Sequence, residues 1–198
     1  RLIYLTKDLM EISKLETGEL KSEIEEIYLY DIINEVVESL QYKAQEEQVN
    51  LFIERIDRNL RVRADKNQLR QVLINLIENG IKYNIPQGRV RIELSPTKRT
   101  DKMILNIEDT GIGIDEADLP RVTERFFRVD KSRSRERGGT GLGLAIVKHI
   151  IEAHGETLKI RSEPNKGSKF SISLTRVDVG ENSHSPDEAT FSEISGRK

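Results

Sequence analysis

A long apolar stretch between residues 69 and 85 constrains this chain more than any other part of its sequence. Its leucine, isoleucine and valine residues recur at spacings of three and four, which predicts an α-helix buried on most sides. Asn75, Asn79 and Lys82 interrupt this pattern at helical spacing, so they share one face of the helix. A buried amide without a hydrogen-bond partner costs a few kcal/mol. The stripe therefore predicts either a polar ligand or, as the plainer alternative, two core asparagines that cap a neighbouring turn.

Composition narrows the class of protein. With 198 residues, 36% of them hydrophobic, the chain can form one domain with its own core and some excess. The net charge of −2 gives no bulk attraction to nucleic acid or to an anionic membrane. No apolar run is long enough to span a bilayer. The absence of cysteine excludes disulfides and thiol chemistry, which fits a reducing compartment.

Strand and helix patterns alternate along the chain and predict an α+β fold. Residues 19–28 are expected to form a linker plus a short edge strand, and further strands are expected at 49–54, 60–63, 90–94, 103–107, 158–160 and 170–174. Helices are expected from Asp31 to about Glu47, from Asp65 through the apolar stretch, from Asp115 to Pro120 and from Gly141 to His154. Asp65 and Gln68 resemble a capping box. We expect a two-layer α/β sandwich, in which a mixed sheet of about five strands is covered on one face by three helices.

The two ends of the chain differ from this pattern. Leu2, Leu5, Leu9 and Ile12 form a coiled-coil seam, which predicts one arm of a helical bundle or, alternatively, a short helix folded back on the domain. The last residues are rich in Ser, Glu, Asp and Gly, which predicts disorder. Because the sequence has no signal peptide and does not begin with Met, we expect an excised fragment. We expect four segments: a helix at 1–17, a linker at 18–22, a domain at 23–176 and a disordered tail at 177–198.

Two glycine clusters flank a basic segment. Gly111 and Gly113 follow a predicted strand, and Gly139, Gly141 and Gly143 lead into a predicted helix. Glycines let a backbone approach a ligand closely, and a helix start presents free N–H groups to an anion such as phosphate. The spacing matches neither the dinucleotide-binding pattern nor the P-loop. Plain turns are the alternative for each cluster taken alone.

The segment between the clusters carries cations that are either a solvated face or a screen for phosphate charge. They are Arg125, Arg128, Lys131, Arg133, Arg135 and Arg137.

Four stretches in this order resemble the ATP-binding catalytic domain of sensor histidine kinases, within the wider GHKL ATPase superfamily. Residues 75–83 are similar to the N box, 109–114 to the G1 box, 125–130 to the F box and 139–147 to the G2 box. The similarity covers roughly residues 23–175. Residues 1–17 resemble the end of the second helix of the family's dimerisation and phosphoacceptor bundle.

The resemblance implies how the phosphates and the metal are bound. Asn79 is implied to hold Mg²⁺, with Asn75 supporting the ion and the phosphates, and Lys82 is implied to reach the phosphates. Arg128 is implied to stabilise charge on the transferring phosphoryl group, so Arg128 and Asn75 are the expected catalytic residues. The G2 box is implied to cradle the phosphates through Gly139, Thr140, Gly141, Leu142, Gly143 and Leu144.

The resemblance also implies how the base is recognised. Tyr83 is implied to stack on adenine, and Asp109 to accept a hydrogen bond from its exocyclic amine. That bond favours ATP over GTP, which has a carbonyl at the same position. Gly111 and Gly113 are implied to clear room for the base.

Two positions depart from the family's usual residues, and a third lies off the ligand face. The family usually has Ala where Gly80 stands, and Gly in a helix costs about 1 kcal/mol. The F box commonly opens with Phe, where this chain has Thr123, so we expect looser packing of the lid over the site. Glu78 lies off the ligand face and is expected to be a surface or supporting residue.

The phosphoacceptor histidine is not found. His149, His154 and His184 are not followed by the acidic residue and proline of the family's acceptor motif. The resemblance therefore implies a fragment that binds ATP and Mg²⁺ and donates the γ-phosphoryl group to a histidine on another helix, of its own or of a second kinase chain. It further implies a response regulator as partner, a homodimer in the full-length protein, and the cytosolic portion of a membrane-anchored sensor. Neither nucleic acid nor direct membrane contact is expected.

Two other functions are weighed against this one. A hydrolytic GHKL ATPase carries Glu where Asn75 stands, and Asn cannot accept a proton from water at neutral pH. A non-catalytic dimerisation module would not need Asn79, Asp109 and both glycine clusters.

Overall fold

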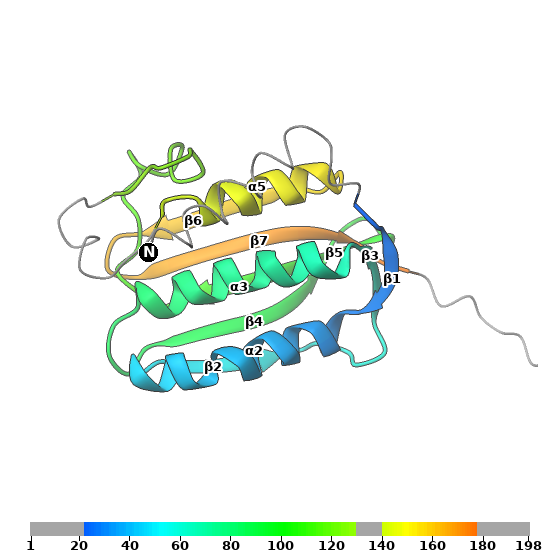
Figure 1. The fold of residues 1–198 in the computed structure, drawn as a ribbon, viewed down its shortest axis with the longest axis horizontal. Coiled ribbons are helices and arrows are strands. Elements are labelled where there is room, and N and C mark those ends of the chain that lie inside the picture. Colours follow the sequence, from blue (N-terminus) through cyan, green and yellow to red (C-terminus); the bar gives the residue numbers. More distant parts are fainter. Residues whose placement is uncertain (1–21, 130–139, 178–198) are drawn as a thin grey trace, which may run out of the picture.

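The computed structural model describes residues 22–129 and 140–177. Within these residues, one layer is a five-stranded sheet and the other consists of three helices that cover one face of it (Figure 1). The helices are α2 (Leu29–Glu46), α3 (Lys66–Lys82) and α5 (Gly143–Ala153). The predicted two-layer α+β sandwich is confirmed.

The main sheet is mixed. Its strands are β2 (Asn50–Glu54), β4 (Arg89–Pro96), β5 (Lys102–Asp109), β7 (Gly167–Thr175) and β6 (Leu158–Glu163), in this spatial order. β2 pairs with β4 in parallel, and the other neighbours are antiparallel. A second, two-stranded sheet pairs β1 (Glu25–Tyr28) with β3 (Arg61–Ala64).

The core lies between the sheet and α3. Leu73, Leu76 and Ile77 of α3 are fully buried, as are Ile92 of β4 and Ile107 of β5, which face each other across the two strands. The apolar alternation of each strand directs these side chains to the helices. The alternate residues of these strands point to the opposite face of the sheet and form ion pairs there. Glu108, for example, pairs with Arg91 at 3.2 Å and with Lys169 at 3.3 Å. This patterning explains why helices cover only one face.

The start of α2 differs from the prediction. The helix begins at Leu29 after Tyr28, and Asp31 lies in its first turn instead of capping it. The Leu29 N–H donates to the carbonyl of Leu60 at 3.1 Å, which satisfies one of the first-turn N–H groups through a distant backbone partner. Asp31 still complements the positive end of the helix dipole.

The predicted cap of α3 is confirmed, but its capping box is only half formed. Asp65 accepts hydrogen bonds from the N–H groups of Asn67 and Gln68 at 2.9 and 3.0 Å. The side chain of Gln68 accepts from Ser22 instead of returning to Asp65. The N–H of Asp65 donates to His154 Nε2 at 3.0 Å, and His154 Nδ1 lies 2.8 Å from the carbonyl of Ile150. The His154 ring therefore joins the end of α5 to the start of α3 by accepting at Nε2.

The helix predicted from Asp115 to Pro120 is not formed. Asp115 does act as a cap, since its Oδ1 accepts from the N–H of Ala117 at 2.9 Å. Its carbonyl accepts from Asp118 and Leu119, but the segment continues as successive turns. Pro120 has no N–H group and cannot extend the helical ladder.

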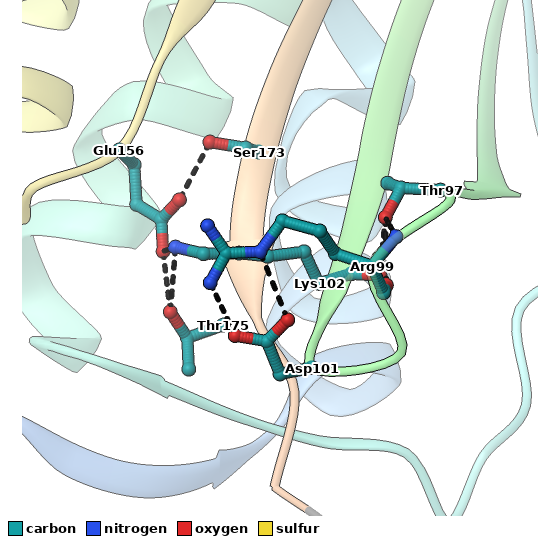
Figure 2. A network of polar contacts seen from close by, with 7 residues as sticks. All are labelled: Thr97, Arg99, Asp101, Lys102, Glu156, Ser173 and Thr175. Atoms are coloured by element: carbon teal, nitrogen blue, oxygen red, sulfur yellow. Dashed lines mark hydrogen bonds and ion pairs between the residues drawn. The ribbon is translucent and has the colours of Figure 1, made fainter.

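A polar network fastens the end of the sheet where β5 begins (Figure 2). Glu156 is 7% exposed and accepts from Lys102 Nζ (2.6 Å), Ser173 Oγ (2.5 Å) and Thr175 Oγ1 (2.7 Å). Burial alone would raise the pKa of Glu156, but these hydrogen bonds outweigh it and the pKa is lowered. A buried carboxylate is tolerated here because each of its oxygens is bonded.

Several expectations fall on residues that the structure does not describe. The helix at 1–17, the linker up to residue 21 and the tail from residue 178 lie outside the described residues. The described helices are all too short or too polar to cross a bilayer.

Candidate functional site

Four segments meet at the end of the sheet where β5 terminates. They are the second half of α3, residues 109–113 after β5, residues 125–128, and residues 140–144 at the start of α5. α3 and α5 run side by side in opposite directions, so the end of one lies near the start of the other (Figure 1). The structure thus brings together the described parts of all four sequence motifs. Gly139 and Lys131, Arg133, Arg135 and Arg137 lie outside the described residues.

The asparagine face of α3 is half-buried and lies next to α5. A methyl group placed on Gly143 would be 3.2 Å from Asn75 Oδ1, so this amide touches the first residue of α5. The side chains of Asn75 and Asn79 form no hydrogen bond with any other described residue. Two half-buried amides without partners, beside a helix start, form a surface for a polar ligand.

Lys82 and Tyr83 continue this face at the end of α3. Lys82 Nζ lies 5.0 Å from the centre of the Tyr83 ring, within the range of a cation–π contact. The backbone of Tyr83 donates to the carbonyl of Asn79 and accepts from the N–H of Ile112, each at 3.0 Å. The helix end is therefore fixed to the segment that follows β5.

Asp109 is a buried carboxyl at the end of β5. It is 9% exposed, and its Oδ1 accepts from the N–H groups of Gly111 (2.8 Å) and Ser168 (3.3 Å). Burial raises the pKa of Asp109 to about 6, which outweighs the opposite effect of these two donors, and the charge of Glu108 adds to the rise. Oδ2 makes no hydrogen bond to any described residue. One carboxylate oxygen is thus anchored while the other is available to a ligand.

The glycines after β5 are required by the protein's own backbone. A methyl group on Gly111 would lie 2.3 Å from the carbonyl oxygen of Tyr83. Gly113 has a φ of +70°, and a methyl group there would lie 2.0 Å from the carbonyl oxygen of Glu163. These close approaches explain why both positions are glycine even without a ligand, in addition to the predicted clearance for a base.

The start of α5 is fastened to the segment before it. Gly141 has a φ of +72°, and its carbonyl accepts from the N–H of Phe126 at 2.9 Å. Leu142 is fully buried and its N–H donates to Thr140 Oγ1 at 3.3 Å. Leu144 is half-buried against the core, and the first turn of the helix leaves backbone N–H groups free of intrahelical partners.

Arg128 lies on the segment attached to α5. It is half-buried and follows Phe127, whose ring lies 4.3 Å from the guanidinium carbon of Arg121. Thr123, which stands where the family commonly has Phe, is half-buried next to the buried Val122. Arg128 is therefore held on the same segment that the Phe126–Gly141 hydrogen bond ties to the site.

Asn84 is a site residue that the sequence patterns did not single out. It is 8% exposed, and its Nδ2 donates to the carbonyls of Gly80 (2.8 Å) and Arg89 (3.1 Å). Its Oδ1 accepts from the hydroxyl of Thr110 at 3.1 Å. Asn84 thus joins the end of α3 to β4 and to the segment after β5. A turn-forming polar residue directly after a helix was the only signal in the sequence.

The structure gives a reason for glycine at position 80 and shows the contact that Glu78 makes. A methyl group on Gly80 would lie 2.9 Å from Val90 Cγ2, so this part of α3 packs too closely on β4 for an Ala without rearrangement. Glu78 forms an ion pair with Lys43 of α2 at 2.8 Å, away from the asparagine face. Glu78 is therefore a half-exposed residue that links two helices, in agreement with the expectation of a surface or supporting residue.

Comparison with known proteins identifies the family. The family model of histidine kinase-, DNA gyrase B- and HSP90-like ATPases matches residues 64–178, more than half of the chain. The chain belongs to this family. This ATPase-like domain is of the histidine kinase type, and ATP is its nucleotide.

Curated and solved relatives agree with this assignment. The signal transduction histidine-protein kinase ArlS of Staphylococcus aureus is 36% identical over 173 residues, which cover 87% of this chain and 37% of ArlS. The structure of the histidine kinase AdeS of Acinetobacter baumannii has a TM-score of 0.71 at 27% identity and covers 89% of this chain and 79% of that one. Full-length ShkA in complex with AMPPNP, at 23% identity and a TM-score of 0.78, shares the fold over 89% of this chain and 36% of its own. The chain spans little more than a third of the length of the curated relatives it matches.

Proposed function

We propose that this domain binds Mg-ATP and donates the γ-phosphoryl group to a histidine of a dimerisation domain, as in two-component signalling. The observation that carries the proposal is the pair of half-buried amides, Asn75 and Asn79, which have no partner among the described residues and lie beside the start of α5. A triphosphate with its metal ion satisfies both the amides and the free N–H groups of that helix.

The base is bound at the end of β5. Oδ2 of Asp109 accepts the exocyclic amine of adenine, since Oδ1 is occupied by backbone donors. Tyr83 stacks on the base at the end of α3, and Gly111 and Gly113 keep the backbone clear of it. GTP presents a carbonyl where adenine has its amine, so an ionised Asp109 repels it.

The metal and the phosphates are bound along α3 and α5. Within residues 22–129 and 140–177 there is no group of three His, Cys, Asp or Glu side chains that could hold a metal ion. A single amide oxygen, from Asn79, fits Mg²⁺, because this ion keeps several waters and takes its other ligands from phosphates. When bound, Mg²⁺ neutralises phosphate charge.

The remaining side chains act on the phosphates directly. Lys82 contributes a positive charge and Asn75 a hydrogen-bonding amide. Residues 139–144, which include Thr140, Leu142 and Leu144, contribute a row of backbone donors. Arg128 stabilises charge on the transferring group. These tasks are positioning and electrostatic stabilisation, which phosphoryl transfer chiefly requires.

The acceptor histidine is supplied from outside the described domain. His154 uses both ring nitrogens in the contacts to Asp65 and Ile150, so it has no free nitrogen to phosphorylate. Because Asn75 cannot serve as a base for water, transfer to a nucleophilic histidine is favoured over hydrolysis. The acceptor helix belongs to the same or a second kinase chain, and a response regulator then receives the phosphoryl group. We assign residues 1–17 to the second helix of that bundle, 23–176 to the catalytic domain, and the whole to the cytosolic part of a membrane-anchored homodimeric sensor.

Transfer of label from γ-labelled ATP tests this function. We expect the 198-residue chain alone to acquire no acid-labile phosphohistidine, and the full-length protein to acquire it. Label on His149 or His154 of the chain alone would contradict the assignment of the acceptor. Steady release of inorganic phosphate without any labelled protein would instead favour a hydrolytic ATPase.

A further inference from the structure

The turn between β6 and β7 supports the segment that follows β5. The N–H of Asn165 donates to the carbonyl of Ile112 at 2.7 Å. Gly113 and Gly167 pack so closely that added methyl groups would lie 2.0 Å from the Glu163 carbonyl oxygen and 1.9 Å from the Asp109 carbonyl oxygen. Because these are backbone contacts, neither side can shift without moving the other.

Ser162 lies at the centre of this contact. Its hydroxyl accepts from the N–H of Ile114 at 2.8 Å and donates to the carbonyl of Gly167 at 2.9 Å. The hydroxyl of Ser168 lies 2.9 Å away and is able to donate to the remaining lone pair. One half-buried hydroxyl therefore joins β6, the beginning of β7 and the segment after β5.

These hydrogen bonds lead directly to Asp109. Ser168 follows Gly167, and its N–H is one of the two donors that anchor Asp109 Oδ1. The other donor, the N–H of Gly111, belongs to the segment that Ser162 holds through Ile114. Both anchors of the base-recognising carboxyl thus depend on segments that meet at the Ser162 hydroxyl.

We propose that Ser162 is a positioning residue for base recognition, which keeps Asp109 oriented toward the exocyclic amine of adenine by holding Ile114 and Gly167 together. This inference rests on the proposed function. Ser162 does not touch the nucleotide, so it acts through the orientation of Asp109. Without the hydroxyl, the binding-competent arrangement is populated less often, and the apparent affinity falls by that fraction.

The test compares Ser162→Ala with two other variants. Ser162→Thr retains the hydroxyl on a strand residue. Ser173→Ala removes a hydroxyl that is also hydrogen-bonded on the sheet, to Glu156, but lies at the end where β5 begins (Figure 2). Affinities for non-hydrolysable ATP and GTP analogues are measured by calorimetry below the unfolding temperature of each variant, with thermal unfolding recorded in parallel.

We expect Ser162→Ala to weaken binding of the ATP analogue about tenfold, from the loss of one to two hydrogen bonds. Binding of the GTP analogue, which lacks the amine, is expected to change much less, so the preference for ATP falls. Ser162→Thr restores the preference, and Ser173→Ala lowers the unfolding temperature without altering it.

Two results would overturn the inference: an unchanged preference in Ser162→Ala, whether both affinities fall equally or neither falls, or the same loss of preference in Ser173→Ala. A wild-type chain that binds neither analogue would refute the proposed function itself. A wild-type chain that prefers ATP, together with a Ser162→Ala variant that prefers it equally, would refute only the role of Ser162.

Discussion

Protonation of Asp109 gives a quantitative prediction for nucleotide binding. An ordinary aspartate has a pKa of 3.8, and burial raises the pKa of Asp109 to about 6. The carboxylate that accepts the adenine amine is therefore about nine-tenths ionised at pH 7 and about one-tenth ionised at pH 5. If only the ionised form binds, the affinity for ATP falls about tenfold between these two pH values.

The same reasoning fixes the effect of the nucleotide on the titration. A ligand that prefers the ionised form must lower the pKa of Asp109, since linkage is reciprocal. We would follow the carboxyl carbon of Asp109 by NMR across pH 4 to 8, with and without a saturating ATP analogue. The free protein is expected to titrate near pH 6 and the complex at clearly lower pH. A titration that is unchanged or raised by the nucleotide would refute the role of Asp109 as acceptor.

The raised pKa also sets how Asp109 affects stability. The folded protein binds this proton more tightly than the unfolded chain, so the contribution of Asp109 to stability is greatest below pH 3.8 and is lost as the pH rises through about 6. The difference between the two pKa values corresponds to about 3 kcal/mol. Keeping this buried carboxyl ionised at neutral pH therefore lowers the stability of the folded protein. A carboxylate that accepts the adenine amine must nevertheless be buried and ionised.

Two further predictions concern the same end of the sheet. Asp109→Asn is expected to reduce the preference for ATP over GTP about tenfold, because an amide can also donate to the guanine carbonyl; competition calorimetry would show this, and an identical preference would contradict it. Gly80→Ala is expected to destabilise the domain by about 1 kcal/mol, because the clash with Val90 outweighs the gain in helix propensity. Denaturant unfolding of Gly80→Ala, Val90→Ala and the double variant should reveal favourable coupling between the two sites, and strictly additive effects would refute the explanation.

Local patterns in the sequence were sufficient to predict the main elements. The apolar period of α3 and the alternation in β4, β5 and β7 depend only on which residues face the core, and each was confirmed. Helical spacing also predicted that Asn75 and Asn79 share one face of α3, and the structure adds that Asn75 on this face contacts the start of α5.

The features that the sequence could not predict depend on distant residues. α2 begins before Asp31, at Leu29, whose N–H donates to the carbonyl of Leu60, 31 residues later in the chain. The capping box of Asp65 is incomplete because His154, 89 residues later, takes the N–H that the box would use. The contact of Gly113 with Glu163 joins segments that are far apart in the sequence. The hydrogen bond between Ile114 and Ser162 does the same, since these residues are 48 positions apart. No local spacing rule encodes such pairs.

The metal-dependent step of binding tests the central claim most directly. Calorimetric titration with a non-hydrolysable ATP analogue, with and without Mg²⁺, is compared for the wild type, Asn79→Ala and Asn34→Ala. Asn34 is the matched control, since it lies on α2 and its side chain donates to Glu38 at 2.7 Å, one turn along the same helix. We predict that Asn79→Ala remains folded and loses the Mg²⁺-dependent affinity, while Asn34→Ala retains it. Unchanged Mg²⁺-dependent affinity in Asn79→Ala would contradict the assignment of the asparagine face to the metal-bound triphosphate.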